Sequence, residues 1–329
     1  MGDLYGSLSL QFGINNAMPI KIPFNLPARK ILESEGVLVI KDTDATRQDV
    51  RPMRLALLNL MPEKINTETQ LARVLGGSPL QVEITLIAPS TYIPKNTPRA
   101  HMLDFYHPWT DIRDSKFDGL IVTGAPVEKM PFEEVDYWPE LQQIFDWSTT
   151  NVHSAFNLCW GAQAALYHFY GIPKYRLDGK LFGVFKHRVL DHTSLLTNGL
   201  NDEIPIPVSR HTENHGEDFA AFENLQILME SDEAGVCMVI DRKLRHVHMF
   251  NHLEYDSTTL ATEYQRDIAK GEAIAPPQHY FPNDDPSQAP INTWRGNGHL
   301  MYGNWLNYIY QTVPFDTDLI GTGAGDSKL

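Results

Sequence analysis

Two short motifs carry residue types that can do nucleophilic chemistry. The first is Cys159, where the apolar run 153–159 passes directly into 160–171, a segment with helical spacing. A reactive residue between a strand and a helix, followed by Gly161, has the layout of a nucleophile elbow. The helix dipole and free backbone N–H groups stabilise a thiolate there and can also hold a developing oxyanion. Cys159 is therefore the candidate nucleophile.

The second motif is His252-Leu253-Glu254, which follows the strand-like run 245–251. Residues two apart in an extended segment point to the same side, so His252 and Glu254 can face one cleft. A general-base histidine needs a partner that fixes its tautomer, and a carboxylate does this. Cys159, His252 and Glu254 would then form a triad. A solvated His–Glu pair and a small buried cysteine remain open as alternatives.

Other cysteine and histidine residues fit structural roles better. Cys237 lies within the apolar run 236–241 and is predicted to be a buried core residue. His246 and His248 alternate along one predicted strand, and we interpret them as polar positions of an edge strand. His211 is a further candidate base, but the sequence reveals no partner to orient it. Without a Cys pair or a His-Glu-x-x-His pattern, we predict no metal site.

Composition excludes several classes of function. The chain has 329 residues, a net charge of −14 and two cysteines. An acidic surface disfavours nucleic acids and anionic membranes as partners. Two cysteines rule out a disulfide framework and fit a reducing cytoplasm. The N-terminus lacks the pattern of a secretory signal, and no apolar run reaches the roughly 18 residues of a membrane span. We expect a cytoplasmic protein.

The segments that must position the two motifs alternate between predicted strands and predicted helices. Apolar strand-like runs occur at 54–61, 82–89, 117–126 and 153–159, and helical spacing occurs at 68–77, 133–148 and 160–171. This alternation predicts an α/β fold with a mostly parallel sheet flanked by helices.

The later third of the chain has a different pattern. Runs at 225–231, 236–241 and 245–251 are joined by short turns and predict an antiparallel edge. A helix at 257–271, loops at 275–293 and a last helix at 300–312 follow. We predict one domain at 18–315 with an elaborated C-terminal part, an extension or tag at 1–17, and a disordered tail at 316–329.

Segments along nearly the whole predicted domain resemble one known family. The chain is similar to the homoserine O-acyltransferases of methionine biosynthesis, which are related to class I glutamine amidotransferases and share their flavodoxin-like sheet. The matching segments are LPARKIL, LNLMPEKINTETQ, FDGLIVTGAPVE, FEEVDYW, CWGAQAALYHFYGIPKY, GVFKH, SRHTE, LEYDSTTLATEYQRD and NWLNYIYQ. The resemblance implies that Cys159 is acylated, that His252 is the general base and that Glu254 is its partner.

The resemblance also implies residues that contact an amino-acid acceptor. These are Lys180, Ser209 and Arg266. A guanidinium can bind a carboxylate through two parallel hydrogen bonds, which suits Arg266 to the acceptor carboxylate. On sequence alone, Arg266 could equally be a solvated helix charge paired with Glu263 or Asp267.

Two further residues concern the acyl donor. Lys64, in LMPEK, would lie on the acyl-donor side by resemblance. Glu128 ends the GAPVE segment after the predicted strand 117–126, where ligands bind in open α/β sheets. By resemblance, relatives that use succinyl donors have a glycine at this position. A glutamate would fill that space and repel the free carboxylate of a succinyl group, so we expect acetyl-CoA as the donor.

The expected reaction is ping-pong transfer of an acetyl group from acetyl-CoA to Cys159 and then to L-homoserine. Backbone N–H groups near Cys159 and Trp160 would hold the oxyanion. No permanently bound cofactor is needed, and the resemblance suggests a homodimer.

Asn157, Asn251 and 294–304 depart from the family pattern and leave the acceptor open. L-Serine is one methylene shorter, worth about 1–3 kcal/mol of discrimination. A cysteine hydrolase or glutamine amidotransferase is a further alternative.

Overall fold

A computed structural model of the protein describes residues 20–322, apart from Phe24, Gly36, Leu38, 41–50 and 92–96. The predicted extension at 1–17 lies outside the described residues, as do 323–329 of the predicted tail. Residues 316–322 are described, and they pack against the domain. Ile320 is buried and its carbonyl accepts a hydrogen bond from Lys116 Nζ (3.0 Å). This part of the tail prediction was wrong, because a single buried apolar side chain is too weak a signal to distinguish from a tail.

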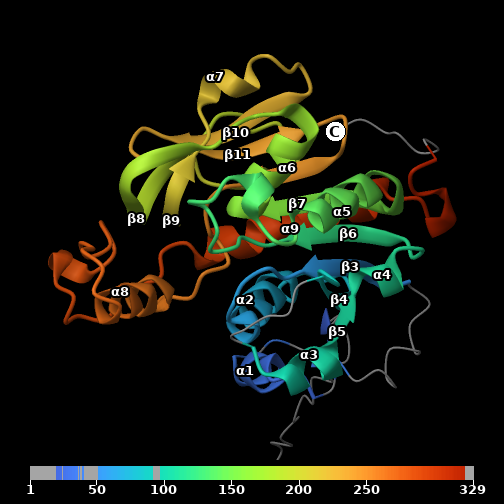
Figure 1. Ribbon diagram of the computed structural model, residues 1–329, viewed down its shortest axis with the longest axis horizontal. Helices are drawn as coiled ribbons and strands as arrows, with labels where there is room; N and C mark the ends of the chain where they lie inside the picture. The colour runs from blue at the N-terminus through green and yellow to red at the C-terminus, as the bar shows by residue number, and fades with distance from the viewer. Residues whose placement is uncertain are drawn as a thin grey trace, which may run out of the picture.

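The described strands form one mixed sheet (Figure 1). They are β1 (Ile20–Lys21), β2 (Val39–Ile40), β3 (Met53–Leu58), β4 (Val82–Ala88), β5 (Tyr106–Pro108), β6 (Phe117–Val122), β7 (Val152–Leu158), β8 (Tyr175–Val189), β9 (Glu203–Glu213), β10 (Leu225–Ser231), β11 (Gly235–Asp241) and β12 (His246–Met249). Their order is β2-β1-β4-β3-β6-β7-β12-β11-β10-β8-β9, with β5 paired to β4. All pairs from β2 to β12 are parallel, and all pairs from β12 to β9 are antiparallel.

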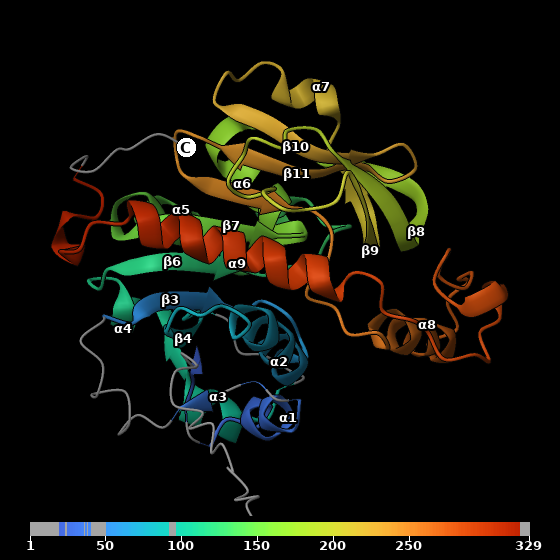
Figure 2. The same ribbon diagram turned by 180° about the vertical axis from the view of Figure 1, so that it is seen from behind.

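The helices cover both faces of the sheet. They are α1 (Ala28–Ser34), α2 (Lys64–Leu75), α3 (Arg99–Phe105), α4 (Trp109–Ile112), α5 (Trp138–Asn151), α6 (Trp160–Tyr170), α7 (Gly216–Phe219), α8 (Thr259–Ala269) and α9 (Arg295–Thr312), with short 3₁₀ turns η2 (Phe132–Glu134), η3 (Pro282–Asp284) and η4 (Thr317–Leu319). α5 and α6 lie on the face seen in Figure 1, and α9 lies across the opposite face (Figure 2). The predicted α/β architecture is confirmed.

Alternate residues of the central strands divide between two cores. Phe156 of β7 packs with α2 and α9, whereas its neighbour Ala155 packs with α5 and α6. Successive side chains of a strand point to opposite faces, so a strand covered on both sides must be apolar throughout. This is why β3, β6 and β7 appear in the sequence as continuous apolar runs.

The prediction of the antiparallel edge was partly wrong. β10 and β11 do pair antiparallel, but β12 lies inside the sheet between β7 and β11. The sheet instead ends at β9, which pairs with β8, and the sequence pattern predicted neither of these strands. β9 contains Pro205 and Pro207, which an edge strand tolerates because their missing N–H groups face no partner.

The burial of β12 changes the interpretation of its two histidines. His246 and His248 are buried, so they are not solvated edge positions. Burial lowers the pKa of His246 to about 4 and that of His248 to about 3, which keeps both rings neutral near pH 7. Within the described ranges, no group of three or more His, Cys, Asp or Glu residues is placed to hold a metal.

No helix in the described part of the chain has the length and apolar character needed to cross a membrane.

Candidate active site

Cys159 occupies the turn between β7 and α6 in a strained conformation. Its backbone has φ 50° and ψ −120°, a region that non-glycine residues rarely adopt. Such strain costs about 1–3 kcal/mol and is typical of nucleophile elbows. Gly161 makes the turn possible, since a Cβ there would lie 2.6 Å from the Thr123 carbonyl oxygen. The strand–cysteine–helix layout predicted from the sequence is present.

His252 and Glu254 lie beside the elbow because β7 and β12 are neighbours. The Cys159 amide donates to Met249 O (2.7 Å), which aligns the ends of the two strands. His252 Nδ1 is 2.7 Å from Glu254 Oε1, and the imidazole is close enough to Cys159 for the two side chains to interact. With Nδ1 committed to Glu254, Nε2 is the ring nitrogen left available for the sulfur.

The charges of the site favour a protonated His252. Burial alone would lower the pKa of its imidazole, but Glu254 and Cys159 outweigh burial and hold that pKa well above its usual value. A histidine beside a cysteine can serve as its acid–base partner in nucleophilic catalysis. The three side chains are therefore arranged as a nucleophile, an acid–base group and an orienting carboxylate.

The backbone N–H groups near the elbow are not equally available as oxyanion donors. The Cys159 amide is already bonded to Met249 O, so it does not point at a reacting carbonyl. The Trp160 amide, at the start of α6, remains as the candidate donor. Gly124 lies in front of it, because a Cβ on Gly124 would stand 3.8 Å from Trp160 N. The absence of a side chain there leaves room for an acyl oxygen.

Glu128 lies close to the triad. Its Oε2 accepts a hydrogen bond from the His211 amide (2.5 Å). Burial raises the pKa of Glu128, while the His211 amide and the nearby charges of His252 and Lys180 oppose that rise. His211 thus contributes its backbone amide, rather than its imidazole, to this position.

Lys180, Ser209 and Arg266 meet in one polar cluster formed by β8, β9 and α8. Lys180 Nζ lies 3.1 Å from Glu263 Oε2 and 3.0 Å from Asp267 Oδ2. Ser209 Oγ donates to Glu263 Oε2 (2.6 Å), and Arg266 Nε donates to Asp267 Oδ1 (2.8 Å). The pairing of Arg266 with Asp267, which the sequence left open, is present, and all three predicted acceptor residues lie together.

Tyr255 connects this cluster to the triad. Its ring stacks on His252, with centroids 4.1 Å apart and planes 12° apart, and its hydroxyl donates to Glu263 Oε1 (3.2 Å). The sequence did not single out Tyr255 or assign Glu263 a role of its own. The spacing of Glu263 and Asp267 on one helix face was the available signal, but it is equally typical of a solvated salt bridge.

Arg210 was also missed, although it is fully buried beside the site. Its Nη1 donates to Asn251 Oδ1 (3.3 Å), and Asn251 Nδ2 lies 2.8 Å from His187 Nε2. Asn251, one of the departures from the family pattern, therefore links two buried side chains directly before His252. Burial lowers the pKa of Arg210, and Cys159 and Glu213 are the first groups that oppose this change.

Lys64 lies at the same edge of the sheet as Cys159, just after β3. Its ammonium is buried and donates to Asn59 O and to Met61 O (3.4 Å). Burial lowers its pKa to about 8, with Glu68 opposing the change. The ammonium is directed at carbonyls of its own loop, so contact with an acyl donor remains a prediction for Lys64.

Comparison with known sequences identifies close relatives. A family model described as homoserine O-succinyltransferase matches residues 19–315. A homoserine O-acetyltransferase of Hyphomonas neptunium is 55% identical over 92% of this chain and all of its own length. One from Rhizobium johnstonii is 54% identical over 93% of this chain and 99% of its own. One from Brucella canis is 51% identical over 92% and 99%.

Solved structures with low sequence identity share the fold. A Thermoplasma acidophilum protein described as belonging to a GMP synthase matches with a TM-score of 0.51 and 13% identity, over 80% of this chain and 96% of its own. A glutamine amidotransferase of Thermotoga maritima matches with a TM-score of 0.50 and 10% identity, over 80% and 98%. The predicted glutamine amidotransferase-like fold is confirmed by these matches.

Proposed function

The chain belongs to the homoserine O-succinyltransferase family, and on this premise we propose that it transfers an acetyl group from acetyl-CoA to the side-chain hydroxyl of L-homoserine. The observation that carries the proposal is the buried alignment of Cys159, His252 and Glu254 next to a polar cluster suited to an amino acid. Homologues covering nearly the whole chain are named homoserine O-acetyltransferase, which supports an acyltransferase.

In the first half-reaction, the Cys159 thiolate attacks the thioester carbonyl of acetyl-CoA. The resulting oxyanion would face the Trp160 amide, where a fixed N–H dipole stabilises developing charge. Collapse of the tetrahedral intermediate breaks the carbon–sulfur bond to CoA, and His252 protonates the departing thiolate. The enzyme is left as acetyl-Cys159 with a neutral imidazole.

In the second half-reaction, the acceptor binds in the cluster formed by β8, β9 and α8. Its carboxylate would pair with Arg266 and Lys180, and its ammonium with Glu263, which exchange their present partners for the ligand. His252 removes the hydroxyl proton as the oxygen attacks the acetyl thioester. The Cys159 thiolate leaves, O-acetyl-L-homoserine forms, and His252 is again protonated.

The choice of acetyl over succinyl rests on Glu128. Its buried carboxylate interacts with the charges of His252 and Lys180, and a succinyl group bound next to the triad would bring a second carboxylate into the same region. Two carboxylates in a confined site repel, so the shorter uncharged acetyl group is preferred. Substitution Glu128→Gly should raise kcat/KM for succinyl-CoA relative to acetyl-CoA. An unchanged ratio in a folded variant would overturn the donor assignment.

One assay separates the proposed reaction from its alternatives. Release of CoA thiol is followed with acetyl-CoA and homoserine, with serine, or with no acceptor. We expect release that depends on homoserine, parallel double-reciprocal lines, acetyl-Cys159 in a mass spectrum after quenching, and no turnover by Cys159→Ala. A preference for serine would move the enzyme to L-serine O-acetylation. Equal release without an acceptor would make it a hydrolase.

The co-substrate, the compartment and the oligomeric state complete the proposed function. Acetyl-CoA acts as a co-substrate, and no cofactor is permanently bound. Cys159 and Cys237 are both free thiols, which fits work in the cytoplasm. A homodimer is expected, and size-exclusion chromatography with light scattering would test it.

A further inference from the structure

Helix α9 crosses the sheet on the face opposite α6 (Figure 2). The residue that caps its N-terminus and two of its own positions, spaced four residues apart, meet the segment 252–255 that carries the proposed base. They are Trp294, Gly298 and Tyr302. Residues at this spacing lie on one side of a helix, so a single face of α9 supports the whole base segment.

Each of these positions makes a different contact. Trp294 Nε1 donates to Tyr255 O (2.8 Å). Gly298 lets the backbone come close, since a Cβ there would lie 2.6 Å from Leu253 O. The Tyr302 hydroxyl lies 3.5 Å from Glu254 Oε2, the carboxylate oxygen that His252 does not use.

The same helix is anchored on the strand that leads to Cys159. The Tyr302 ring stacks on Phe156, with centroids 5.0 Å apart and planes 21° apart. Trp305 Nε1 donates to Ser154 Oγ (3.0 Å). Because Ser154 and Phe156 belong to β7, α9 joins the strand of the nucleophile to the segment of the base.

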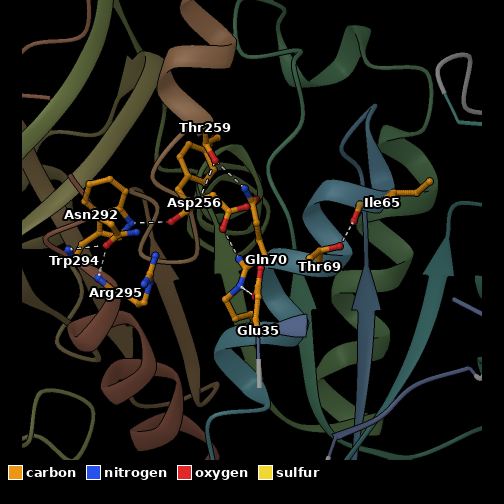
Figure 3. A network of polar contacts seen from close by, with 11 residues as sticks. Glu35, Ile65, Thr69, Gln70, Asp256, Thr259, Asn292, Trp294 and Arg295 are labelled. Atoms are coloured by element: carbon orange, nitrogen blue, oxygen red, sulfur yellow. Dashed lines mark hydrogen bonds and ion pairs between the residues drawn. The ribbon is translucent and has the colours of Figure 1, made fainter. Parts of the chain in front are cut away.

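The N-terminal end of α9 is fixed as well (Figure 3). Asn292 Oδ1 accepts hydrogen bonds from the amides of Trp294 (3.1 Å) and Arg295 (2.8 Å). On the other side of the base segment, Thr259 Oγ1 accepts from the Asp256 amide (3.1 Å) and from Gln70 of α2 (2.9 Å). The residues directly after the base segment are therefore tied to α2, while α9 contacts the base segment itself.

We propose that the Trp294–Gly298–Tyr302 face of α9 sets the position of His252 and Glu254 relative to Cys159, with Tyr302 as a positioning residue that donates a hydrogen bond to Glu254 Oε2. The proposal rests on the triad of the proposed function. A carboxylate held at both oxygens cannot rotate about its terminal bond, so Oε1 stays aligned with His252 Nδ1.

The environment of Tyr302 supports a donor role. Burial, and then Glu254, raise the pKa of its hydroxyl well above the usual value, so it keeps its proton. Glu254 Oε2 is the acceptor that this hydroxyl meets among the described residues. Hydrogen bonds at active sites are often long before the substrate binds and shorten in the complex.

The first test uses a matched pair of glycines in α9. Gly298→Ala places a methyl group against Leu253 O, whereas a Cβ on Gly303 meets no atom within 4 Å. We expect Gly298→Ala to lower kcat by about 30-fold or more in both half-reactions, and Gly303→Ala to stay within about twofold of wild type. Equal activity of the two folded variants would overturn the proposal.

The second test removes only the hydroxyl, so folding is preserved. Tyr302→Phe should lower kcat about three- to tenfold with unchanged KM for homoserine. Without the donated hydrogen bond, Glu254 attracts the His252 proton more strongly, so the acid limb of kcat/KM for homoserine should move to higher pH. The control Tyr308→Phe, at an α9 position that is equally buried, should change neither kcat nor the acid limb of kcat/KM.

These outcomes are separable from those of the proposed function. If Cys159→Ala retains turnover, the triad itself is wrong. If Cys159→Ala is inactive while Tyr302→Phe keeps the wild-type rate and pH profile, only the role of Tyr302 is overturned, and the Gly298 pair then decides whether α9 positions the base.

Discussion

Cys159 and His252 are neighbours in space, but their positions are fixed in different ways. Cys159 is set mainly by its own stretch of chain, where β7 ends, the backbone turns with φ 50° and α6 begins. Gly161, two residues later, supplies the space for that turn. An elbow of this kind is a local structure, and the sequence pattern was sufficient to predict it.

His252 and Glu254 are set by elements far away in the sequence. The His252 amide donates to Pro207 O of β9 (2.9 Å), and Asn251 is bonded to Arg210 and His187. Helices α9 and α2 contact the residues that follow. A substitution near the elbow should therefore reduce stability and activity together. A substitution in a distant element that contacts the base segment should reduce activity by shifting His252 and Glu254.

The largest effect is expected from Glu254→Gln. The amide keeps the shape of the carboxylate but not its charge, so His252 loses the group that raises its pKa and fixes its tautomer. We expect kcat to fall about 10²–10⁴-fold in steady-state assays, with little change in thermal unfolding. Glu233, which pairs with His279 at the surface, provides the control, and Glu233→Gln should be silent.

Gly161→Ala should break the elbow itself. The new methyl group would lie 2.6 Å from Thr123 O and 3.0 Å from Val122 O, both of which are backbone atoms of the central sheet. We expect urea denaturation to show a loss of about 1–3 kcal/mol in the free energy of unfolding, together with reduced acylation of Cys159. Gly296→Ala, where a Cβ meets no atom within 4 Å, should be neutral. Full stability of Gly161→Ala would contradict the need for a glycine at this turn.

Asn251→Ala should affect the base segment without touching its catalytic groups. It removes the acceptor for Arg210 Nη1 and the partner of His187 Nε2, and so leaves two buried polar groups unpaired. We expect a loss of about 1–2 kcal/mol in unfolding free energy and a several-fold fall in kcat. Wild-type values for both would show that β9 alone is sufficient to hold His252.

The last prediction concerns stability alone and involves Lys64, which lies near the elbow and is buried as an ammonium. Its pKa is lowered to about 8 by burial, so the folded state binds this proton less tightly than the unfolded state does. The resulting cost is present below pH 8 and disappears as the pH rises toward the unfolded value of about 10.4. Wild type should therefore gain roughly 3 kcal/mol relative to Lys64→Met between these values. Denaturation curves that keep a constant difference would refute this.

The central parallel strands were predictable because burial on both faces leaves a continuous apolar run. The apolar runs at 54–61, 117–126 and 153–159 correspond to β3, β6 and β7. β8 and β9 were not predicted, since their outer positions are partly exposed and mix apolar with polar residues. The start of α9 was placed too late, at 300 instead of Arg295, because Gly296 and Gly298 weaken the helical signal.

Lys180, Ser209 and Arg266 came only from the family resemblance, since ordinary polar residues carry no signal of their own. The structure places them together because β8, β9 and α8 converge, and it adds Glu263, which the pattern had offered only as a surface partner.

By itself, the sequence determined the elbow that carries Cys159, the proposed nucleophile, and the pairing of His252 with Glu254, because each depends on residues close together along the chain. The tertiary structure alone decided that β12 lies next to β7, that the Cys159 amide donates a hydrogen bond to Met249 O, and that α9 contacts the base segment. These features depend on which distant surfaces are complementary in shape and hydrogen bonding, and local spacing does not encode that information.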